Sequence, residues 1–556
     1  MKFLESCRLL ISTLSPVHIG CDEDYDPTNY VIENHTLHEF EPSAVQKALT
    51  IQDRRELLRI VSNPNNQRML QEVQAFFYQR RHVLIMVAKR RVPVVQKLVE
   101  FYQGRVGQTV QTEGDGSQLI NKLAIGRTFF NPVSGAPILP GSSLKGAIRT
   151  ALLDSINNGK PLLGEESRLA QSKISREQQS ANRKLQQRLF QSREFEQDPM
   201  RLVQLMDAGF MDREGVGSEL RFAVNRRRKA PKPGDSSTKS QAEQRDLYQL
   251  LECIPAARFR VFAGELTVQR VDSIYNGGDR LPSLSFRWDA QQIAMACNRF
   301  YRQQLEMELE QMRERGYLDV HWAKMIEQLL NGPVGQRLKQ NQAFLLRVGR
   351  HSGAESMTLD GVRSIKIMLG QDGVTRRMNS ENRATGTSWW LAASDTQART
   401  GMLPFGWLLV ELQPMDQPLL DWTETREALS GLSTEYMVWL ERERQRVVVA
   451  LRQQADEDAR QQAAITRANA TLEQKAIAEL RDWFIADRKT KQLKPMGRVV
   501  GTLNRLLKEG LSWPLADRRA LATLAEEIFN QKSIGGDDKA QRERQAKIQQ
   551  LLEEKQ

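Results

Sequence analysis

Short runs of strand-forming residues alternate along the chain with longer segments in which apolar residues recur at helical spacing. Strands are predicted at 8–15, 258–268, 344–348, 387–392 and 403–412. Helical insertions are predicted between them, at about 44–103, 160–250 and 289–340. Segments of both kinds within one chain predict an α+β fold, with a sheet core in 1–420 and a helical module with a charged tail in 421–556.

Residues 138–153 combine a turn with a helix. Pro140-Gly141 is typical of a turn, and Ser142 is a suitable N-cap for the residues that follow. Helical spacing places five apolar side chains on one face, which we expect to be buried: Leu144, Ala147, Ile148, Ala151 and Leu152.

The other side of this predicted helix is basic. Lys145 and Arg149 lie four residues apart and would repel each other, because no carboxylate occupies the neighbouring positions of the same helix. Backbone N–H groups of Gly141, Ser142 and Ser143 at the helix start, next to two cations, predict a phosphate-binding site. An ordinary capped helix with a solvated basic face is the alternative.

A second glycine-rich segment follows the strand near residue 344. Arginine, histidine, serine and glycine residues alternate there in Arg347-Val-Gly-Arg-His-Ser-Gly353. Backbone amides and guanidinium groups could converge on a phosphate, so we count five residues as candidates for RNA contact: Arg347, Gly349, Arg350, His351 and Gly353. The spacing fits neither a Walker loop nor a dinucleotide fingerprint, and a hairpin connection with surface charges is the alternative.

Residues 225–235 contain a cationic run, including Arg227 and Arg228, followed by proline and glycine. This composition predicts a flexible basic loop. Contact with RNA phosphates and a solvated connection both stay open.

His18 follows the first predicted strand. It is a candidate for RNA contact, and a catalytic role in RNA cleavage would require an acid–base partner that the sequence does not reveal. The acidic segment 22–26 carries alternating carboxylates, but it lacks the glycine and glutamate of a calcium-binding loop. We therefore expect no metal, no cofactor and no catalytic residue.

Composition points to a polyanionic partner. The 556 residues include 80 Lys and Arg against 68 Asp and Glu, a formal net charge of +12. Four dispersed cysteines support neither a disulfide framework nor a zinc ribbon. No apolar run is long enough for a membrane span and no secretory signal is visible, so a cytoplasmic protein is expected.

The motif Pro140-Gly-Ser-Ser-Leu-Lys-Gly-Ala-Ile-Arg-Thr150 resembles the signature of the RAMP superfamily found in type III CRISPR effector complexes. A first strand ending in Thr13-Leu-Ser-Pro-Val-His-Ile-Gly20, followed by an acidic loop, is similar to the start of the fifth subunit of the Csm complex. The Gly349–Ser356 loop and the Pro404-Phe-Gly-Trp407 segment also resemble this superfamily.

The resemblance implies an RNA-recognition-motif-like (ferredoxin-like) sheet in a backbone subunit of a type III-A antiviral complex. Such a subunit would bind guide RNA, cap the 3′ side of the complex and take part in guide maturation without cutting RNA. The implied partners are guide RNA, other backbone subunits and, indirectly, target RNA, with no membrane. A metal-independent endoribonuclease and a helical scaffold with incidental RNA binding are the alternatives.

Overall fold

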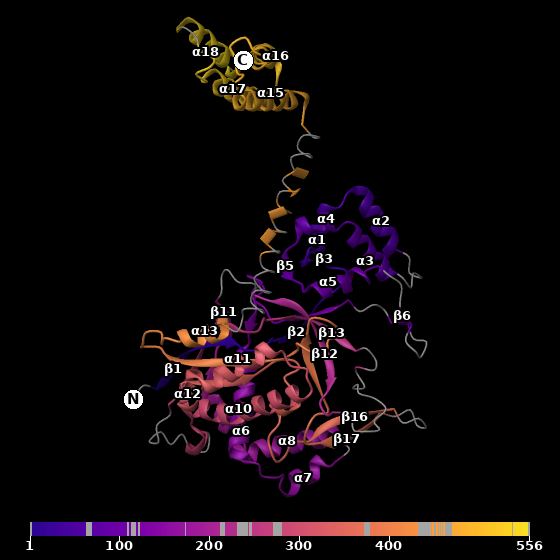
Figure 1. The fold of residues 1–556 in the computed structure, drawn as a ribbon, viewed down its shortest axis with the longest axis vertical. Helices are drawn as coiled ribbons and strands as arrows, with labels where there is room; N and C mark the ends of the chain where they lie inside the picture. The colour runs from indigo at the N-terminus through magenta and orange to yellow at the C-terminus, as the bar shows by residue number, and fades with distance from the viewer. Residues whose placement is uncertain are drawn as a thin grey trace. The chain divides into compact units, whose positions relative to one another are not determined.

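The structure is a computed structural model (Figure 1). It describes residues 3–62, 69–107, 111–112, 118–119, 123–172, 174–211, 217–230, 243, 247–270, 281–371, 378–431, 470–535 and 538–553, with single residues and pairs between 445 and 461. The predicted α+β class is confirmed, because helices and several sheets alternate along the described chain.

The main sheet is antiparallel at each of its strand pairs and has the order β15-β20-β1-β14-β11-β9, with β10 also pairing with β14. Its strands are β1 (Leu4–Thr13), β9 (Ile138–Leu139), β10 (Val203–Leu205), β11 (Ala208–Phe210), β14 (Arg258–Gln269), β15 (Ala343–Arg347) and β20 (Trp407–Pro414). The last half of β1 is fully buried, since the strand runs between β14 and β20.

A second sheet has the order β19-β18-β12-β13-β8-β2. Its strands are β2 (Gly20–Tyr25), β8 (Ile125–Thr128), β12 (Glu219–Arg227), β13 (Tyr248–Cys253), β18 (Ser388–Ala393) and β19 (Leu403–Pro404). Val17, just after β1, exchanges two backbone hydrogen bonds with Ile254, just after β13. These bonds join the end of the central strand to the second sheet.

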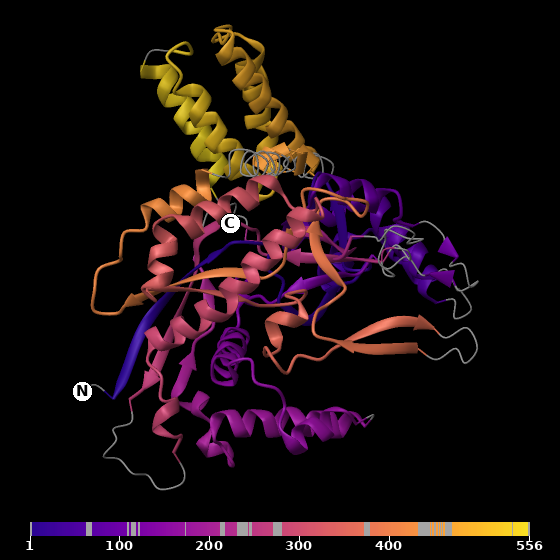
Figure 2. The ribbon, with the colours of Figure 1, turned by 60° about the horizontal axis from the view of Figure 1, so that its bottom comes forward.

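Two helices pack together beside the main sheet (Figure 2). Helix α6 (Gly141–Asn157) buries the five apolar residues predicted for its inner face, and α10 (Ala290–Glu314) packs on both α6 and β15. The Tyr301 hydroxyl on α10 donates to the Ala147 carbonyl on α6 over 3.0 Å. Helices α11 (Val320–Asn331), α12 (Pro333–Lys339) and α13 (Thr423–Gly431) complete this side.

The insertion predicted as helical at 44–103 also contains part of a sheet. Strand β5 (Arg90–Pro93) pairs with β4 (Thr36–Glu39), which pairs with β3 (Tyr30–Glu33). The helices are α1 (Pro42–Ala48), α2 (Ile51–Val61), α3 (Met69–Gln79), α4 (Arg81–Leu84) and α5 (Gln96–Gln103). Short strand pairs elsewhere are β6 (Gln111–Thr112) with β7 (Gln118–Leu119) and β16 (Ile365–Gln371) with β17 (Met378–Arg383).

The predicted helical insertion at 160–250 is helical only in its first part, in α7 (Gly164–Ala170) and α8 (Ser175–Phe190). The second part supplies β10 to β13, and the basic run predicted as a flexible loop is strand β12 through Arg227. Residues 231–235 of that prediction lie outside the described residues. The basic composition misleads because two arginines of β12 are buried with partners. Arg221 pairs with Glu219 at 2.6 Å, and Arg226 donates to the carbonyls of Thr396 and Ala398.

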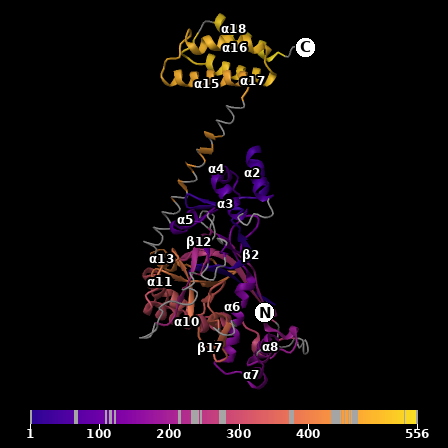
Figure 3. The ribbon, with the colours of Figure 1, turned by 90° about the vertical axis from the view of Figure 1, so that its right-hand side faces the viewer.

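Contacts divide the chain into two compact units, Met1–Val449 and Ala450–Gln556, whereas we predicted a division at 420/421. The second unit has its own apolar core from α15 (Leu472–Lys489), α16 (Arg498–Glu509), α17 (Leu515–Phe529) and α18 (Asp538–Leu552) (Figure 3). The predicted charged tail is therefore mostly helix α18, which buries Ile548 and Leu551 in that core.

Candidate nucleic-acid interface

The glycine-rich loop after β15 packs directly on the segment after β1. The N–H of Arg350 donates to the His18 carbonyl over 2.8 Å. Gly349 has a φ of 83°, and any Cβ on it would overlap that same carbonyl oxygen. Only glycine fits there, so the structure brings together two candidates, His18 and the loop, that lie more than 300 residues apart in sequence.

His18 is buried and held in one tautomer. Its Nδ1 lies 2.7 Å from the Glu252 carbonyl oxygen, and a carbonyl can only accept, so Nδ1 carries the hydrogen. Burial, followed by the positive charge of Arg350, lowers the pKa of His18. A neutral His18 presents Nε2 as an acceptor, between Gly20 and Gly126.

His351 follows Arg350, whose N–H bonds to His18, and it is also neutral. Its ring stacks on Trp390 with centroids 4.9 Å apart, and Nε2 lies 2.9 Å from Gln249 Oε1. Burial, Arg350 and His18 lower the pKa of His351 to about 3. At neutral pH neither histidine offers a positive charge to a phosphate.

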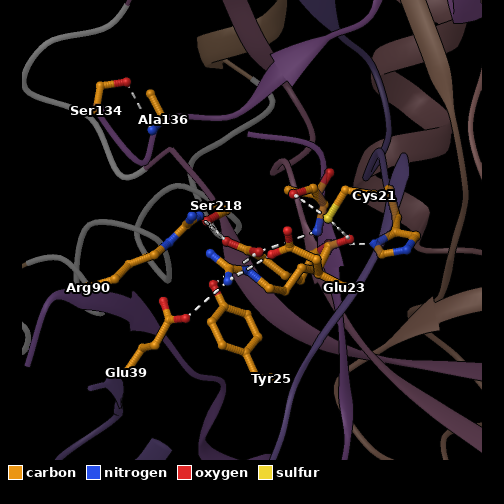
Figure 4. A network of polar contacts seen from close by, with 12 residues as sticks. Cys21, Glu23, Tyr25, Glu39, Arg90, Ser134, Ala136 and Ser218 are labelled. Carbon is orange, nitrogen blue, oxygen red and sulfur yellow. Dashed lines mark hydrogen bonds and ion pairs between the residues drawn. The ribbon is translucent and has the colours of Figure 1, made fainter. Parts of the chain in front are cut away.

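The buried Glu252 contacts His18 through its backbone carbonyl, and its carboxylate joins a polar network that includes Tyr25, Arg90 and Ser218 (Figure 4). Its oxygens accept from the Ser218 hydroxyl at 2.6 Å and from the Tyr25 hydroxyl at 3.2 Å, and they pair with Arg90. The network therefore ties β2, β5 and β13 together. Sequence reasoning missed Glu252, and the available signal was a single acid within the otherwise apolar run Leu250-Leu-Glu-Cys253.

Two of the candidate arginines form ion pairs around the glycine-rich loop. The buried Arg347 pairs with Glu308 at 2.9 Å and donates to the Phe405 carbonyl. Arg228 makes a two-point pair with Glu355, at 2.6 and 2.9 Å, beside Gly353. These arginines position the glycine-rich loop, because Arg347 at its start is fixed to Glu308 of α10 and Glu355 just after it is fixed to Arg228.

The start of α6 differs from the prediction. Pro140, not Ser142, occupies the N-cap position, and no side chain of that residue caps the helix. Instead, the Gly141 N–H donates to the Asp207 carboxylate over 2.7 Å, and any Cβ on Gly141 would overlap the Leu205 carbonyl oxygen. A carboxylate from the β10–β11 turn thus occupies the first N–H group assigned to a phosphate.

The two cations of α6 are in different situations. Arg149 pairs with Asp198 at 2.8 Å, donates to Gln186 and lies over the Phe190 ring, so a distant carboxylate supplies the counter-charge that the helix itself lacks. Lys145 is half-buried, and burial lowers its pKa. Among the described residues no ion pair involves Lys145.

Three candidates for RNA contact stay accessible. Arg350 and Ser142 are exposed, Ser143 is half-buried, and no ion pair with Arg350 is found within the described part of the chain. Arg227 is half-buried at the end of β12 and has interaction partners. The accessible candidates therefore fall into two places: Arg350 next to His18, and Ser142 and Ser143 at the start of α6.

The acidic segment 22–26 is mostly strand β2, with Asp22, Glu23 and Asp24 exposed. No group of three or more His, Cys, Asp or Glu residues suited to a metal ion occurs in the described ranges. No helix in the same ranges is both long and apolar enough to cross a membrane.

One family profile matches the first half of the chain. The RAMP superfamily profile matches residues 10–276, which include the end of β1, His18, α6 and β14. This part of the chain belongs to the RAMP superfamily. The RAMP segment ends before β15, so the Arg347–Gly353 loop is linked to it by its contacts with His18.

The chain also has a named relative. The chain is 27% identical over 153 residues to the CRISPR system Cms protein Csm5 of Streptococcus thermophilus, a match that covers 27% of this chain and 38% of the relative. Two solved structures are similar over 73% of this chain: one from a Csm–crRNA–target RNA ternary complex of a type III-A CRISPR-Cas system (17% identity, TM-score 0.41) and T. onnurineus Csm5 (15%, 0.40). They cover 100% and 99% of those chains.

Proposed function

We propose that this chain is a guide-RNA-binding backbone subunit of a type III-A CRISPR effector complex. The RAMP match over residues 10–276 carries the proposal, and the Csm5 relative supports the type III-A assignment. Within that complex the subunit caps the 3′ side of the guide RNA and takes part in guide maturation without cutting. Its partners are guide RNA and other backbone subunits, with target RNA reached through the guide.

The order of the main sheet supports an RNA-recognition-motif-like core. A ferredoxin-like fold places its four strands in the order 4-1-3-2, with one helix in each β-α-β crossover. Here β20-β1-β14-β10 has that order, all pairs are antiparallel, and α6 and α10 occupy the two crossovers. Strand β15 would then be an addition at the edge next to β20.

The proposed binding mechanism is contact with phosphates rather than with bases. Arg350 and Lys145 supply the positive charge, since no ion pair within the described residues involves either side chain, and Ser142 and Ser143 offer hydroxyl donors. Arg149, Arg228 and Arg347 maintain the surfaces that carry these groups, because their own charges are neutralised inside the protein. Base pairing of the guide would supply sequence recognition.

A paired charge reversal tests this mechanism. Lys145→Glu with Arg350→Glu should weaken binding of an unstructured RNA at least tenfold at physiological salt. It should also reduce the slope of log affinity against log salt concentration by about 1 to 2, because each phosphate contact to a single strand contributes roughly 0.7 to that slope. Fluorescence anisotropy across a salt series measures both quantities.

The matched control is Lys324→Glu with Lys339→Glu, which changes the net charge equally at exposed positions of α11 and α12. It should leave both quantities nearly unchanged. Equal effects of the two pairs would support incidental binding by a helical scaffold instead.

The hydrogen bond from the Arg350 N–H to the His18 carbonyl brings two histidine-containing segments together, which favours a second candidate, the metal-independent ribonuclease. General acid catalysis needs a protonated, accessible imidazole, whereas both rings are shielded and their pKa values are lowered. RNA cleavage that is lost in His18→Ala while binding persists would favour the nuclease. If the subunit does not cut, the unchanged protein and the His18→Ala variant should both leave labelled RNA intact.

A further inference from the structure

The turn between α15 and α16 in the C-terminal unit carries a concentrated positive charge. Five exposed cations fall within eleven residues, and they are Arg488, Lys489, Lys491, Lys494 and Arg498. No acidic residue occurs between the first and the last of them. We refer to these five residues as the basic turn.

The basic turn is rigid and its charge is largely uncompensated. Gln492 N–H donates to the Asp487 carbonyl and Lys491 N–H to the Arg488 carbonyl, the two bonds of a Schellman motif that ends α15. Asp487 also pairs with Arg498 at 2.6 Å. No ion pair is found for the other four cations within the described residues, so a fixed backbone presents them to solvent.

Helix stability explains only part of this arrangement. Arg488 and Lys489 lie in the last turn of α15, where cations favour the helix dipole. Lys494 and Arg498 flank the start of α16, where the dipole favours carboxylates, and the first turn of α16 contains no acid. Arg498 is offset by its pair with Asp487, but the charge of Lys494 does not help the start of α16, so helix stability does not account for it.

Lys491 gives an independent indication. It has a φ of 56° at the position after the cap of α15, a left-handed conformation in which glycine is strongly favoured. A lysine there retains its charge at the expense of backbone strain. Since the side chain is exposed, the strain has no compensating packing.

We infer that the basic turn is a second RNA-binding surface, which contacts the phosphate backbone of single-stranded RNA separately from the first unit. RNA fits better than a membrane, because Met496 is the one large apolar side chain exposed within 490–498, and an interfacial segment needs an apolar face. The inference rests on the proposed function only in expecting RNA to be the polyanion that the chain meets.

The test compares two triple variants of the full chain. Lys489→Gln, Lys491→Gly and Lys494→Gln remove three charges from the basic turn. The matched control, Lys475→Gln, Arg505→Gln and Lys508→Gln, removes three charges from exposed positions elsewhere on α15 and α16. Anisotropy with an unstructured RNA should show a salt slope smaller by about 2 for the first variant, from roughly 0.7 per phosphate contact, and nearly unchanged for the control.

Lys491→Gly alone separates binding from folding. Glycine relieves the strained conformation, so the unfolding temperature should stay equal or rise while RNA affinity falls two- to threefold. Equal slopes for the two triple variants, or binding to anionic vesicles but not to RNA, would overturn the inference. Loss of binding in Lys145→Glu with Arg350→Glu but not in the basic-turn variants would refute this inference alone, and the reverse pattern would refute the proposed mechanism alone.

Discussion

At the residue scale, the candidate arginines of the glycine-rich loop differ in their surroundings. Arg347 faces the buried Glu308, whose other oxygen accepts from the Trp407 indole N–H over 2.9 Å. Arg350, three positions later, has an exposed side chain, and its backbone N–H donates to the His18 carbonyl. Two arginines in one short motif therefore have different tasks, one in folding and the other in the proposed RNA contact.

Replacing Arg347 should damage the fold before it affects RNA. Arg347→Ala leaves the Glu308 carboxylate buried without its counter-ion, which costs about 3–5 kcal/mol of unfolding free energy. Urea unfolding measures the loss. Arg347→Met combined with Glu308→Leu removes both charges and should recover most of the stability, and a double variant as unstable as the single one would contradict the ion-pair explanation.

Stability should also depend on His351. Its pKa is about 3 in the folded protein and close to 6.5 when unfolded, so the unfolded chain binds the proton preferentially and stability falls as pH drops below about 6.5. Between pH 7.5 and pH 5 this residue should account for about 1–2 kcal/mol of lost unfolding free energy.

The corresponding measurement is urea unfolding at the two pH values. His351→Asn tolerates the left-handed φ of 66° and removes the titrating group, so its loss between pH 7.5 and pH 5 should be smaller than that of the unchanged protein. His38, whose pKa is lowered to about 4 mainly by burial, contributes equally in both proteins. An unchanged difference between the two pH values would contradict the assignment.

At the scale of elements, α6 depends on a glycine at its first position. The backbone of the β10–β11 turn lies against Gly141, where a side chain would collide with the Leu205 carbonyl. Gly141→Ala should therefore lower the unfolding free energy by about 1–3 kcal/mol.

Gly146 is the matched control in the same helix. No atom lies within 4 Å of a Cβ placed there, so Gly146→Ala should raise the unfolding free energy by about 0.5–1 kcal/mol through its better helix propensity. Opposite signs in urea unfolding are the expected result. Destabilisation by both substitutions would mean that the helix, rather than its contact with β10–β11, is sensitive.

Apolar periodicity predicted the elements whose burial is simple. Strands β1, β14, β15 and β20 and the inner face of α6 were recognisable because their buried positions are hydrophobic. Strand β12 was not, since its polar residues are buried with partners far away in sequence, and a local pattern cannot reveal them. The Asp207 cap of α6 and the Glu252 network escaped for the same reason.

At the scale of the whole molecule, the sequence motifs identified the RAMP segment. The structure was needed to show that this segment contacts the glycine-rich loop. His18 and the Arg347–Gly353 loop each carry a weak signal alone, and the Arg350–His18 backbone bond joins them. The second unit, with its own core and basic turn, has no counterpart in the resemblance. The cations of the basic turn are visible in the sequence, whereas their exposure and the left-handed conformation of Lys491 required the structure.

The proposed function as a whole is tested most directly by isolating the protein from its native host and sequencing the RNA and proteins that accompany it. Repeat-spacer RNA together with related backbone subunits is the expected result, and the RNA should be depleted when Lys145 and Arg350 are both replaced by glutamate. Protein that emerges without nucleic acid, or with RNA lacking repeat sequences, would contradict the assignment as a guide-RNA-binding subunit.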